Sequence, residues 1–205
     1  MLRADLHVHS TFSDGRDTVM RLLKEAIKRN LNVLSITDHD TIQGSMEAIE
    51  IVNSEHMPIK IIPGSEISTQ SGHVLAYGIY KDIDPQMSIV QTCELVRSQG
   101  GLCFLAHPFD IFRHGTVRIS SFKVVDGVEV YNSKNPFNFL AKKFAERYGR
   151  PGIAGSDAHT AKYVGAAVTF LRNESLDSLL NASYTGKMIL FSRLTSLLSR
   201  LNRRL

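Results

Sequence analysis

Two histidines separated by a single residue lie near the start of the chain, in the segment DLHVHS. Residues two apart on a β-strand point to the same side, so His7 and His9 can direct both imidazoles at one metal ion. Asp157 and His159, in GSDAH, repeat this spacing far along the chain. Imidazole is a common metal ligand and the usual proton carrier near neutral pH. The spacing therefore indicates a metal site assembled from distant parts of the chain.

Residues of the same chemical types occur between these two pairs. They lie in short polar segments that end or follow apolar runs: Asp14, His39, Glu66 and His107. Nitrogen and carboxylate ligands without thiolate suit Zn²⁺, Mn²⁺ or Fe. Five histidines, one glutamate and two aspartates are more than one ion needs at roughly four to six ligands. We therefore predict two or three divalent ions, with Glu66 as the bridging carboxylate.

A single histidine at a strand end is most often a hydrogen-bonded structural residue. Eight ligand-type residues on six successive strand ends have no comparable structural cause. Burying them without metal would leave many polar groups and charges to satisfy. A multinuclear metal site explains the pattern better than eight separate structural roles.

The elements that must position these residues alternate along the sequence. Apolar runs predict strands at 4–9, 33–37, 59–62, 101–106, 127–131, 152–155 and 165–171, with a locally paired strand at 73–79. Three- and four-residue spacings of apolar residues predict helices at 17–30, 45–55, 86–99 and 138–148. This alternation predicts an α/β fold with a parallel sheet or barrel. The carboxyl ends of parallel strands meet at one rim, so the polar segments should converge there.

The composition is that of an ordinary globular domain, which excludes a disordered, collagen-like or coiled-coil chain. We expect one domain over residues 1–205, without a signal peptide or a membrane span, in a cytoplasmic location. An amphipathic helix predicted at 192–205 either covers one end of the fold or binds a partner or membrane surface. Cys93 and Cys103 fall on apolar patterns, which predicts core positions in a reducing compartment rather than a disulfide framework. A net charge of +4 permits anionic partners without requiring them.

The segments DLHVHS, TDHD, GSE, AHPF and GSDAH, in this order and spacing, resemble the motifs of the PHP (polymerase and histidinol phosphatase) family. The resemblance extends from residue 5 to about residue 190. It implies a distorted TIM-like barrel of seven β/α units, the PHP fold. It also implies two or three Zn, Mn or Fe ions and the hydrolysis of phosphoesters by a metal-activated water.

The resemblance also implies a division of the ligands among three ions. One ion would take His7 and His9, with Glu66 and Asp157 completing its shell; a second would share Glu66 and add His107. A third would take Asp14, His39 and His159. The residues that the resemblance implies act most directly in the reaction are Asp157, His159, His39 and Glu66.

Two departures from the family pattern affect this expectation. Some members supply a further histidine or cysteine after the fifth strand, where this chain offers only Asn132, Asn135 and Asn138. We therefore expect a looser second ion site, or one completed by water. The chain also lacks room for an inserted lid domain, since only 40 residues separate Glu66 from His107. An open site is the consequence.

Three residues are predicted to contact substrate: Lys134, Arg16 and His73. Asp40 is predicted to accept a hydrogen bond from a metal-bound imidazole, since such imidazoles usually donate their other N–H to a carboxylate or carbonyl. The favoured function is hydrolysis of a small phosphomonoester of the histidinol phosphate, nucleotide or sugar phosphate type. A phosphodiesterase or exonuclease acting on nucleic-acid ends is an alternative, disfavoured because no aromatic stacking motif is present. A non-catalytic, metal-stabilised scaffold is a third reading.

Overall fold

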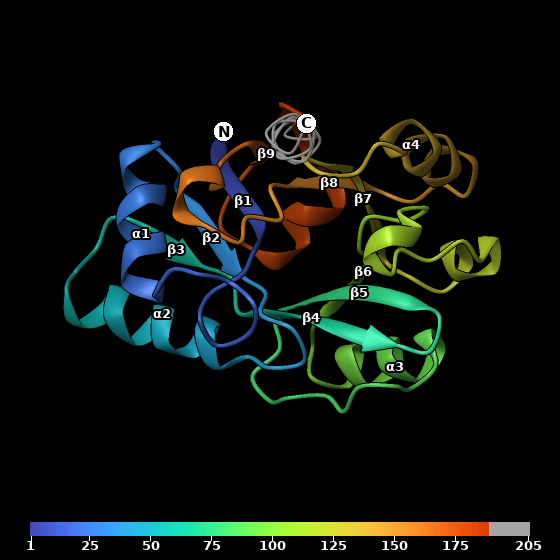
Figure 1. The fold of residues 1–205 in the computed structure, drawn as a ribbon, viewed down its shortest axis with the longest axis horizontal. Helices are drawn as coiled ribbons and strands as arrows, with labels where there is room; N and C mark the ends of the chain where they lie inside the picture. The colour runs from blue at the N-terminus through green and yellow to red at the C-terminus, as the bar shows by residue number, and fades with distance from the viewer. Residues whose placement is uncertain (189–205) are drawn as a thin grey trace, which may run out of the picture.

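The computed structural model describes residues 1–188 as two β-sheets with helices on their outer sides (Figure 1). The strands are β1 Leu2–Val8, β2 Val33–Ile36, β3 Lys60–Ile61, β4 Gly64–Thr69, β5 Gly72–Tyr77, β6 Leu102–Leu105, β7 Gly127–Asn132, β8 Gly152–Gly155, β9 Ala167–Leu171 and β10 Ser183–Gly186. The helices are α1 Val19–Lys28, α2 Gln43–Ser54, α3 Ile89–Ser98 and α4 Asn138–Arg147. Four short 3-10 helices are η1 Ile111–Arg113, η2 Ile119–Lys123, η3 Ala161–Tyr163 and η4 Leu176–Asn181. The predicted helices and strand runs are confirmed to within a few residues, whereas β4 and β10 were not predicted.

The first sheet has the strand order β10-β9-β1-β2-β3. β1, β2 and β3 are parallel, as the β/α alternation predicts. β9 runs antiparallel to β1, with Thr169 opposite Ala4, and β10 runs antiparallel to β9. The sheet is therefore mixed rather than wholly parallel.

The second sheet has the strand order β4-β5-β6-β7-β8. β6, β7 and β8 are parallel, but β4 and β5 form an antiparallel hairpin and β5 is also antiparallel to β6. Glu66 lies inside β4, opposite Leu75, rather than in a loop after a strand. The hairpin turns back at Gly72, whose φ of +120° is accessible to glycine and strained for other residues.

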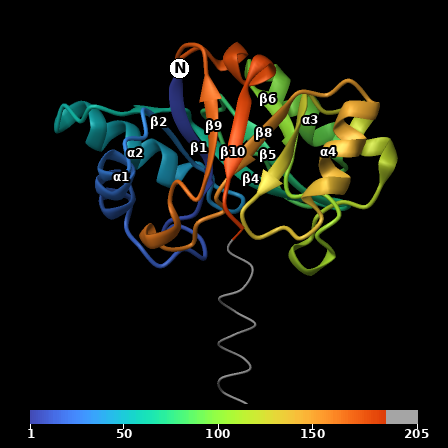
Figure 2. The ribbon, with the colours of Figure 1, turned by 90° about the horizontal axis from the view of Figure 1, so that it is seen from above.

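The two sheets face one another and share an apolar core (Figure 2). The core takes side chains from both sheets, among them Leu6 of β1 and Phe104 of β6, both fully buried. The Tyr77 hydroxyl also donates to the Leu6 carbonyl, 2.9 Å away. Among the described residues, the strand ladders of the two sheets meet only at isolated bridges, Val8 with Ala158 and His39 with Glu66. The α/β class is confirmed; closure into a barrel of seven β/α units is not.

The helices cover the outer sides in pairs (Figure 2). α1 and α2 pack on the first sheet because Leu22, Leu23 and Ala26 lie on one buried face of α1. α3 and α4 cover the second sheet, and α3 starts at a capping box between Ser88 and Gln91. No helix of residues 1–188 is both long enough and apolar enough to span a bilayer.

Two further expectations concern the cysteines and the end of the chain. Cys93 and Cys103 are both fully buried, as predicted for core residues. The structure joins them as a disulfide between α3 and β6, with their Cα atoms 5.4 Å apart, which the sequence reading did not anticipate. The 10-residue separation of these cysteines does not by itself predict that α3 packs over β6 and brings the two sulfur atoms together. The helix predicted at 192–205 lies outside the described residues.

Phe104 provides a test of the shared core. We expect Phe104→Ala to lower the free energy of unfolding by about 3–5 kcal/mol, because the ring is fully buried between the sheets and its loss leaves a cavity. Tyr80→Ala, at a residue that is 62% exposed, is the control and should change it by less than about 0.5 kcal/mol. Urea denaturation of the metal-free proteins measures both values. Equal losses in the two variants would contradict the assignment of this core.

Candidate metal centre

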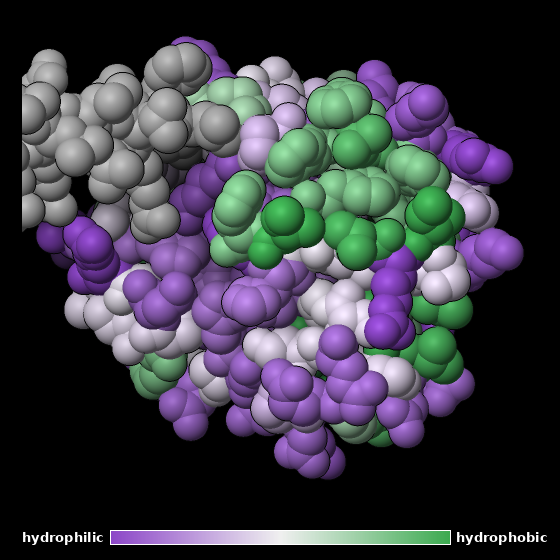
Figure 3. All heavy atoms as spheres, turned by 45° about the vertical axis from the view of Figure 1, so that its right-hand side comes forward, coloured by the Kyte–Doolittle hydropathy of each residue, from purple (hydrophilic) through white to green (hydrophobic). Residues whose placement is uncertain are grey.

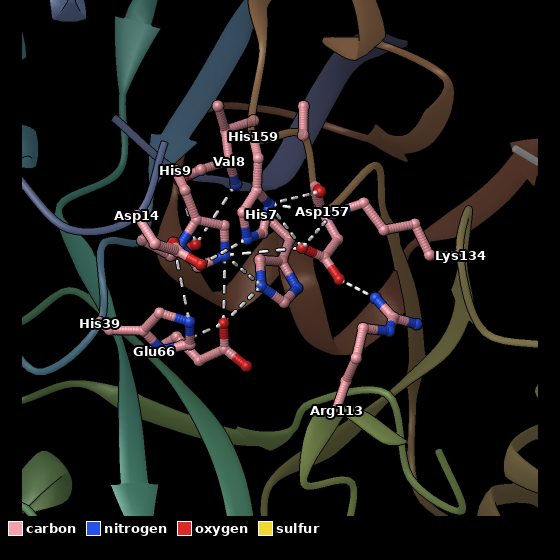
Figure 4. Close-up of polar contacts among 12 residues, drawn as sticks. His7, Val8, His9, Asp14, His39, Glu66, Arg113, Lys134, Asp157 and His159 are labelled. Carbon is pink, nitrogen blue, oxygen red and sulfur yellow. Dashed lines mark hydrogen bonds and ion pairs between the residues drawn. The ribbon is translucent and has the colours of Figure 1, made fainter. Parts of the chain in front are cut away.

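Imidazole and carboxylate groups from both sheets meet at one end of the strands (Figure 4). All eight predicted ligands belong to this cluster, together with one residue that was predicted to bind substrate, His73. Their donor atoms form four overlapping groups, each within 4.8 Å: His9, Asp14, His39 and His159; His7, His9 and Glu66; His7, His107 and Asp157; His39, Glu66 and His73.

Glu66 lies at the middle of the cluster. Its Oε2 is 2.8 Å from His7 Nε2 and 3.1 Å from His9 Nε2. Its Oε1 is 2.8 Å from His107 Nε2 and 2.9 Å from His73 Nδ1. Each oxygen therefore has its own nearest pair of imidazoles, and His39 Nδ1 lies 3.7 Å from Oε2 as a further contact. This is the arrangement that a bridging carboxylate requires.

Asp157 forms the second carboxylate of the buried part. Its Oδ1 is 3.6 Å from His9 Nε2 and 3.1 Å from Lys134 Nζ, and its Oδ2 accepts from Arg113 Nη1. Asp110 orients the same guanidinium, because Asp110 Oδ2 accepts from Arg113 Nη2 at 2.6 Å and from Arg113 Nε at 2.9 Å. Two cationic side chains thus lie against the edge of the cluster that Asp157 defines.

The remaining group faces solvent. Asp14 is 53% exposed, and it lies 2.9 Å from His159 Nε2 and 3.9 Å from His39 Nε2. His39 and His159 are also partly exposed, at 29% and 25%, whereas His7 and His9 are fully buried. The mouth of the site therefore lies at Asp14, His39 and His159.

Close backbone approaches bring these residues together. A Cβ on Gly15 would lie 2.3 Å from the His9 carbonyl oxygen, so only glycine lets the loop fold back and bring Asp14 to His9. A Cβ on Gly155 would lie 2.4 Å from the His7 Cβ, so glycine also permits β8 to approach β1. Serines after β1 are held by Asp38, which accepts from Ser10 and Ser13.

Two of the cluster's residues have positive φ angles, 26° for His107 and 53° for Asp157. Such angles cost of order 1–3 kcal/mol in residues other than glycine and persist where the surroundings impose them. At His107 the backbone N–H donates to Glu129 Oε2 at 2.7 Å. Strain at these two positions is a feature typical of functional sites.

Glu129 contacts the cluster but was not predicted from the sequence. It is fully buried, and its Oε1 lies 3.0 Å from His7 Nδ1, on the side of the ring away from Glu66. It also accepts from Asn132 Nδ2 at 3.0 Å. Glu129 thus holds an imidazole in the way that was predicted for Asp40. The sequence feature that could have identified Glu129 is a carboxylate inside the otherwise apolar strand GVEVYN.

The other predicted residues have distinct positions. Asp40 accepts from the backbone N–H and the hydroxyl of Ser68, at 2.7 and 2.8 Å, rather than from an imidazole. The backbone N–H of Arg16 donates to the His159 carbonyl at 2.9 Å, while the residue as a whole is exposed. Lys134 Nζ is 2.9 Å from His159 Nδ1, at the mouth. His73 lies between Glu66 and a pocket of about 710 Å³.

Burial and charge shift the pKa values in opposite directions. Burial would raise the pKa of Glu66, but charged His7 and three imidazole hydrogen bonds hold it well below its usual value. Burial would lower the pKa of His7, but the surrounding carboxylates raise it well above its usual value. Burial lowers the pKa of His9 to about 4. For His159 the effect of burial is outweighed by hydrogen bonds to Asp14 and Asp157, which raise its pKa to about 9.

The donor set fits divalent cations. His9 Nδ1 and His107 Nδ1 are buried without a hydrogen-bond partner among the described residues, and such groups cost about 1–3 kcal/mol each. His7 Nε2 and His9 Nε2 face one another at 3.1 Å, a spacing at which two imidazole nitrogens need a proton or a cation between them. Nitrogen and carboxylate donors without thiolate are those that Zn²⁺, Mn²⁺ and Fe accept.

An α/β fold with such a donor cluster at its strand ends is typical of metal-dependent hydrolases. The chain belongs to the PHP family: the PHP domain matches residues 5–150, and the PHP-associated family matches residues 135–187. Relatives to which the chain is similar include hydrolases acting on phosphoester bonds.

Similar proteins include one from an archaeon and one from a bacterium. The uncharacterized protein MJ0417 of Methanocaldococcus jannaschii is 33% identical over 178 residues, which are 81% of this chain and 69% of MJ0417. The 5'-3' exoribonuclease Rnm of Escherichia coli is 42% identical over 65 residues, which are 32% of this chain and 22% of Rnm.

Solved structures show the same fold at lower identity. A two-domain protein of Bacteroides vulgatus, described as containing a predicted PHP-like metal-dependent phosphoesterase, superposes with a TM-score of 0.76 and 21% identity. The match covers 91% of this chain and 65% of that chain.

The raised imidazole pKa values predict that metal binding releases protons. In the metal-free protein His7 and His159 hold protons near neutral pH, and an imidazole must lose its proton to bind metal. We expect the affinity for Zn²⁺ or Mn²⁺ to rise as the pH increases from about 6 to about 9. Calorimetric titrations at about pH 7 in Tris and in PIPES should differ in heat by more than the equivalent of one proton per protein. Identical heats in the two buffers would contradict the predicted release of protons on metal binding.

Proposed function

We propose that this protein hydrolyses a small phosphomonoester at the cluster, with water as the nucleophile. The observation that carries the proposal is the position of Glu66, whose two oxygens each face a separate pair of imidazoles. One carboxylate between two sets of nitrogen donors is suited to hold two ions at the distance that phosphoester hydrolysis uses.

The ligands that we propose are the eight named from the sequence: His7, His9, Asp14, His39, Glu66, His107, Asp157 and His159. Two or three Zn, Mn or Fe ions held by them would polarise a phosphoryl oxygen and lower the pKa of a coordinated water. His73 contacts the same oxygen of Glu66 as His107 does, so it is a further candidate ligand beside its predicted role toward substrate. Glu129 fixes the orientation of the His7 ring.

The chain's own cations supply the phosphate site in this proposal. Lys134 and Arg113 lie against Asp157 with side chains only 22% and 23% exposed. If Asp157 were to ligate a metal ion, both groups would be free to bind phosphoryl oxygens, and Asp110 holds the guanidinium of Arg113 in place. Arg16 is retained as a weaker candidate, since its exposed side chain lies two residues from Asp14.

The leaving group of the substrate has a pocket beside the cluster. The pocket of about 710 Å³ shares His39 and His73 with the cluster, and its lining includes Gln70, Thr116 and Arg118. No acidic residue belongs to the lining, which suits a polar or anionic leaving group. Nucleoside and sugar phosphates meet this condition, whereas the histidinol part of histidinol phosphate carries an ammonium group that has no acidic partner in the lining.

A second candidate function is phosphodiester hydrolysis at nucleic-acid ends. The similarity to Rnm and the exposed side chain of Asp14 at the mouth favour it. In both cases we propose a cytoplasmic location. The Cys93–Cys103 disulfide is the one observation against this location, since such bonds are rare in reducing compartments.

A comparison of monoester and diester tests the proposal. Protein loaded with Mn²⁺, Fe²⁺ or Zn²⁺ should turn over p-nitrophenyl phosphate faster than bis(p-nitrophenyl) phosphate. His9→Ala should lose bound metal and lower kcat/KM by at least about 10³-fold, because His9 touches both carboxylates of the buried cluster. His56→Ala, at an exposed histidine, is the matched control and should change neither. Faster diester turnover would favour the second function, and metal binding without turnover of either ester would favour the scaffold.

Lys134 tests the phosphate site separately. Lys134→Ala should lower kcat/KM by about 10- to 100-fold, the effect of about 1.5–3 kcal/mol expected for a hydrogen bond to a charged group. Lys142→Ala on α4, where the side chain is 58% exposed, should leave the kinetics unchanged. Metal analysis accompanies both variants. If Lys134→Ala lost metal but kept its KM, the lysine would serve to hold Asp157 rather than substrate.

A further inference from the structure

The asparagine at the end of β7 lies between the metal cluster and the proposed phosphate site. Asn132 is fully buried, and its Nδ2 donates to Glu129 Oε2 at 3.0 Å and to Asp157 Oδ2 at 3.2 Å. Its Oδ1 accepts from Arg113 Nη1 and Nη2, both at 3.3 Å, and from the Lys134 backbone N–H at 2.9 Å. One amide therefore contacts two carboxylates on one side and the residues of both cations on the other.

An amide side chain suits this position because it donates and accepts hydrogen bonds at the same time. An ionised carboxylate here would accept but not donate, so it would oppose Asp157 and Glu129. An apolar side chain would leave the buried polar groups around it without a partner, which costs free energy. The chemistry of Asn132 is thus matched to both sets of neighbours.

The asparagines after the fifth predicted strand are held by groups of the protein itself. Asn138, the first residue of α4, accepts from the Asn132 backbone N–H and donates to the Asn132 carbonyl, each at 2.9 Å. Asn135 donates to the Pro108 carbonyl at 3.0 Å and accepts from the Phe137 N–H at 2.8 Å. The amides that the sequence offered in place of a further metal ligand therefore have structural partners, and the backbone of Asn132 is fixed from α4.

The surface beside Asn132 shows that Arg113 is turned inward for a polar reason. Large apolar side chains lie on the outside of η1 and the start of α4 (Figure 3), where Ile111, Phe112 and Phe139 are 63%, 83% and 67% exposed. Arg113, the charged residue of η1, is only 23% exposed and reaches Asp157 (Figure 4). Arginine is usually exposed and large apolar residues are usually buried. The polar partners of Arg113 therefore set its direction, since hydrophobic burial would favour the reverse.

The contacts of the Arg113 guanidinium show what the amide of Asn132 adds. Asp110 Oδ2 accepts from Nε and Nη2. Nη1 donates to Asp157 Oδ2 and to Asn132 Oδ1. If Asp157 were to ligate a metal ion, the amide oxygen would be the remaining partner of Nη1 among residues 1–188.

We propose that Asn132 is a positioning residue that couples phosphate binding to the metal centre. Its Oδ1 keeps Arg113 and the loop of Lys134 directed at the cluster, while its Nδ2 holds Asp157 on the adjoining side. The coupling rests on the proposed function in one respect, namely that Arg113 and Lys134 bind phosphoryl oxygens.

Binding of inorganic phosphate to the Zn²⁺-loaded protein, measured by calorimetry, tests the coupling without turnover. Asn132→Ala should raise the Kd for phosphate by about tenfold, the effect of one hydrogen bond to a charged group, while the protein keeps its metal. Asn181→Ala, at an exposed asparagine, is the matched control and should leave the Kd unchanged. An unchanged Kd in Asn132→Ala, or a raised Kd that is explained by loss of bound metal, would overturn the proposal.

A double-mutant cycle separates positioning from a general loss of structure. Arg113→Ala alone should raise the Kd for phosphate by about 30-fold. Adding Asn132→Ala to it should raise the Kd by less than about threefold more, because the amide acts mainly through the guanidinium. Effects that multiply in the double variant would show that the two residues act independently, and would overturn the proposal.

Asn132→Asp is a second variant that keeps the test decisive if Asn132→Ala does not fold. It retains the size of the side chain but gives Asp157 a carboxylate in place of an N–H donor, so phosphate should bind at least as weakly as in Asn132→Ala. Phosphate binding as tight as in the unmodified protein would overturn the proposal. Turnover of p-nitrophenyl phosphate is measured separately: coupling without turnover would overturn the proposed function alone, and turnover without coupling would overturn the role of Asn132 alone.

Discussion

The carboxylate of Glu66, almost completely buried and contacted by five imidazoles, is the interaction on which the site depends. A buried carboxylate is costly unless positive charge accompanies it. Protonated imidazoles supply that charge in the metal-free molecule, and divalent ions would supply it in the loaded one. The two sheets share the contacts of this carboxylate, since β4 brings Glu66 to His7 and His9 from the first sheet, while His73 and His107 come from the same sheet as Glu66.

The same constraint explains the outer contacts of the cluster. Asp157 has Lys134 and Arg113 beside it, so its charge is balanced even before an ion binds. Glu129 balances His7 on the face of the ring away from Glu66. The backbone has positive φ angles at His107 and Asp157, a conformation that costs free energy in residues other than glycine. The fold accepts local strain at these residues because the side chains must point inward.

Much of this could be predicted from the sequence because the chemistry was local. The pairs His7 with His9 and Asp157 with His159 could be interpreted from spacing alone, because residues two apart on a strand point to the same side. The spacing of apolar residues likewise located the helices. The antiparallel hairpin could not be predicted in the same way. The run after Ile62 is short and polar, so β4 was not recognised and Glu66 was assigned to a loop. Glu129 was missed because a carboxylate within an apolar strand is identified only by its partners, which lie far away in the sequence.

The disulfide and the partner of Asp40 illustrate the same limit. Cys93 and Cys103 are on apolar patterns, and only the packing of α3 on β6 brings their sulfur atoms together. Asp40 flanks His39 in sequence but turns to Ser68, since its own φ of 56° directs the chain toward β4. Asp40 thus shows that a residue next to a histidine in sequence need not contact its imidazole when the backbone turns between them.

The way in which the two sheets are joined has a consequence for the cost of binding an ion. On one side they share an apolar core that includes Leu6, Phe104 and Tyr77. On the other side backbone hydrogen bonds join them, since the His9 N–H donates to the Ala158 carbonyl at 2.9 Å and the Asp40 N–H donates to the Glu66 carbonyl at 3.0 Å. Both sides are thus fixed while the donor atoms carry no ion. An arriving ion would meet ligands that are already in position, so little of its binding free energy is lost to ordering the chain.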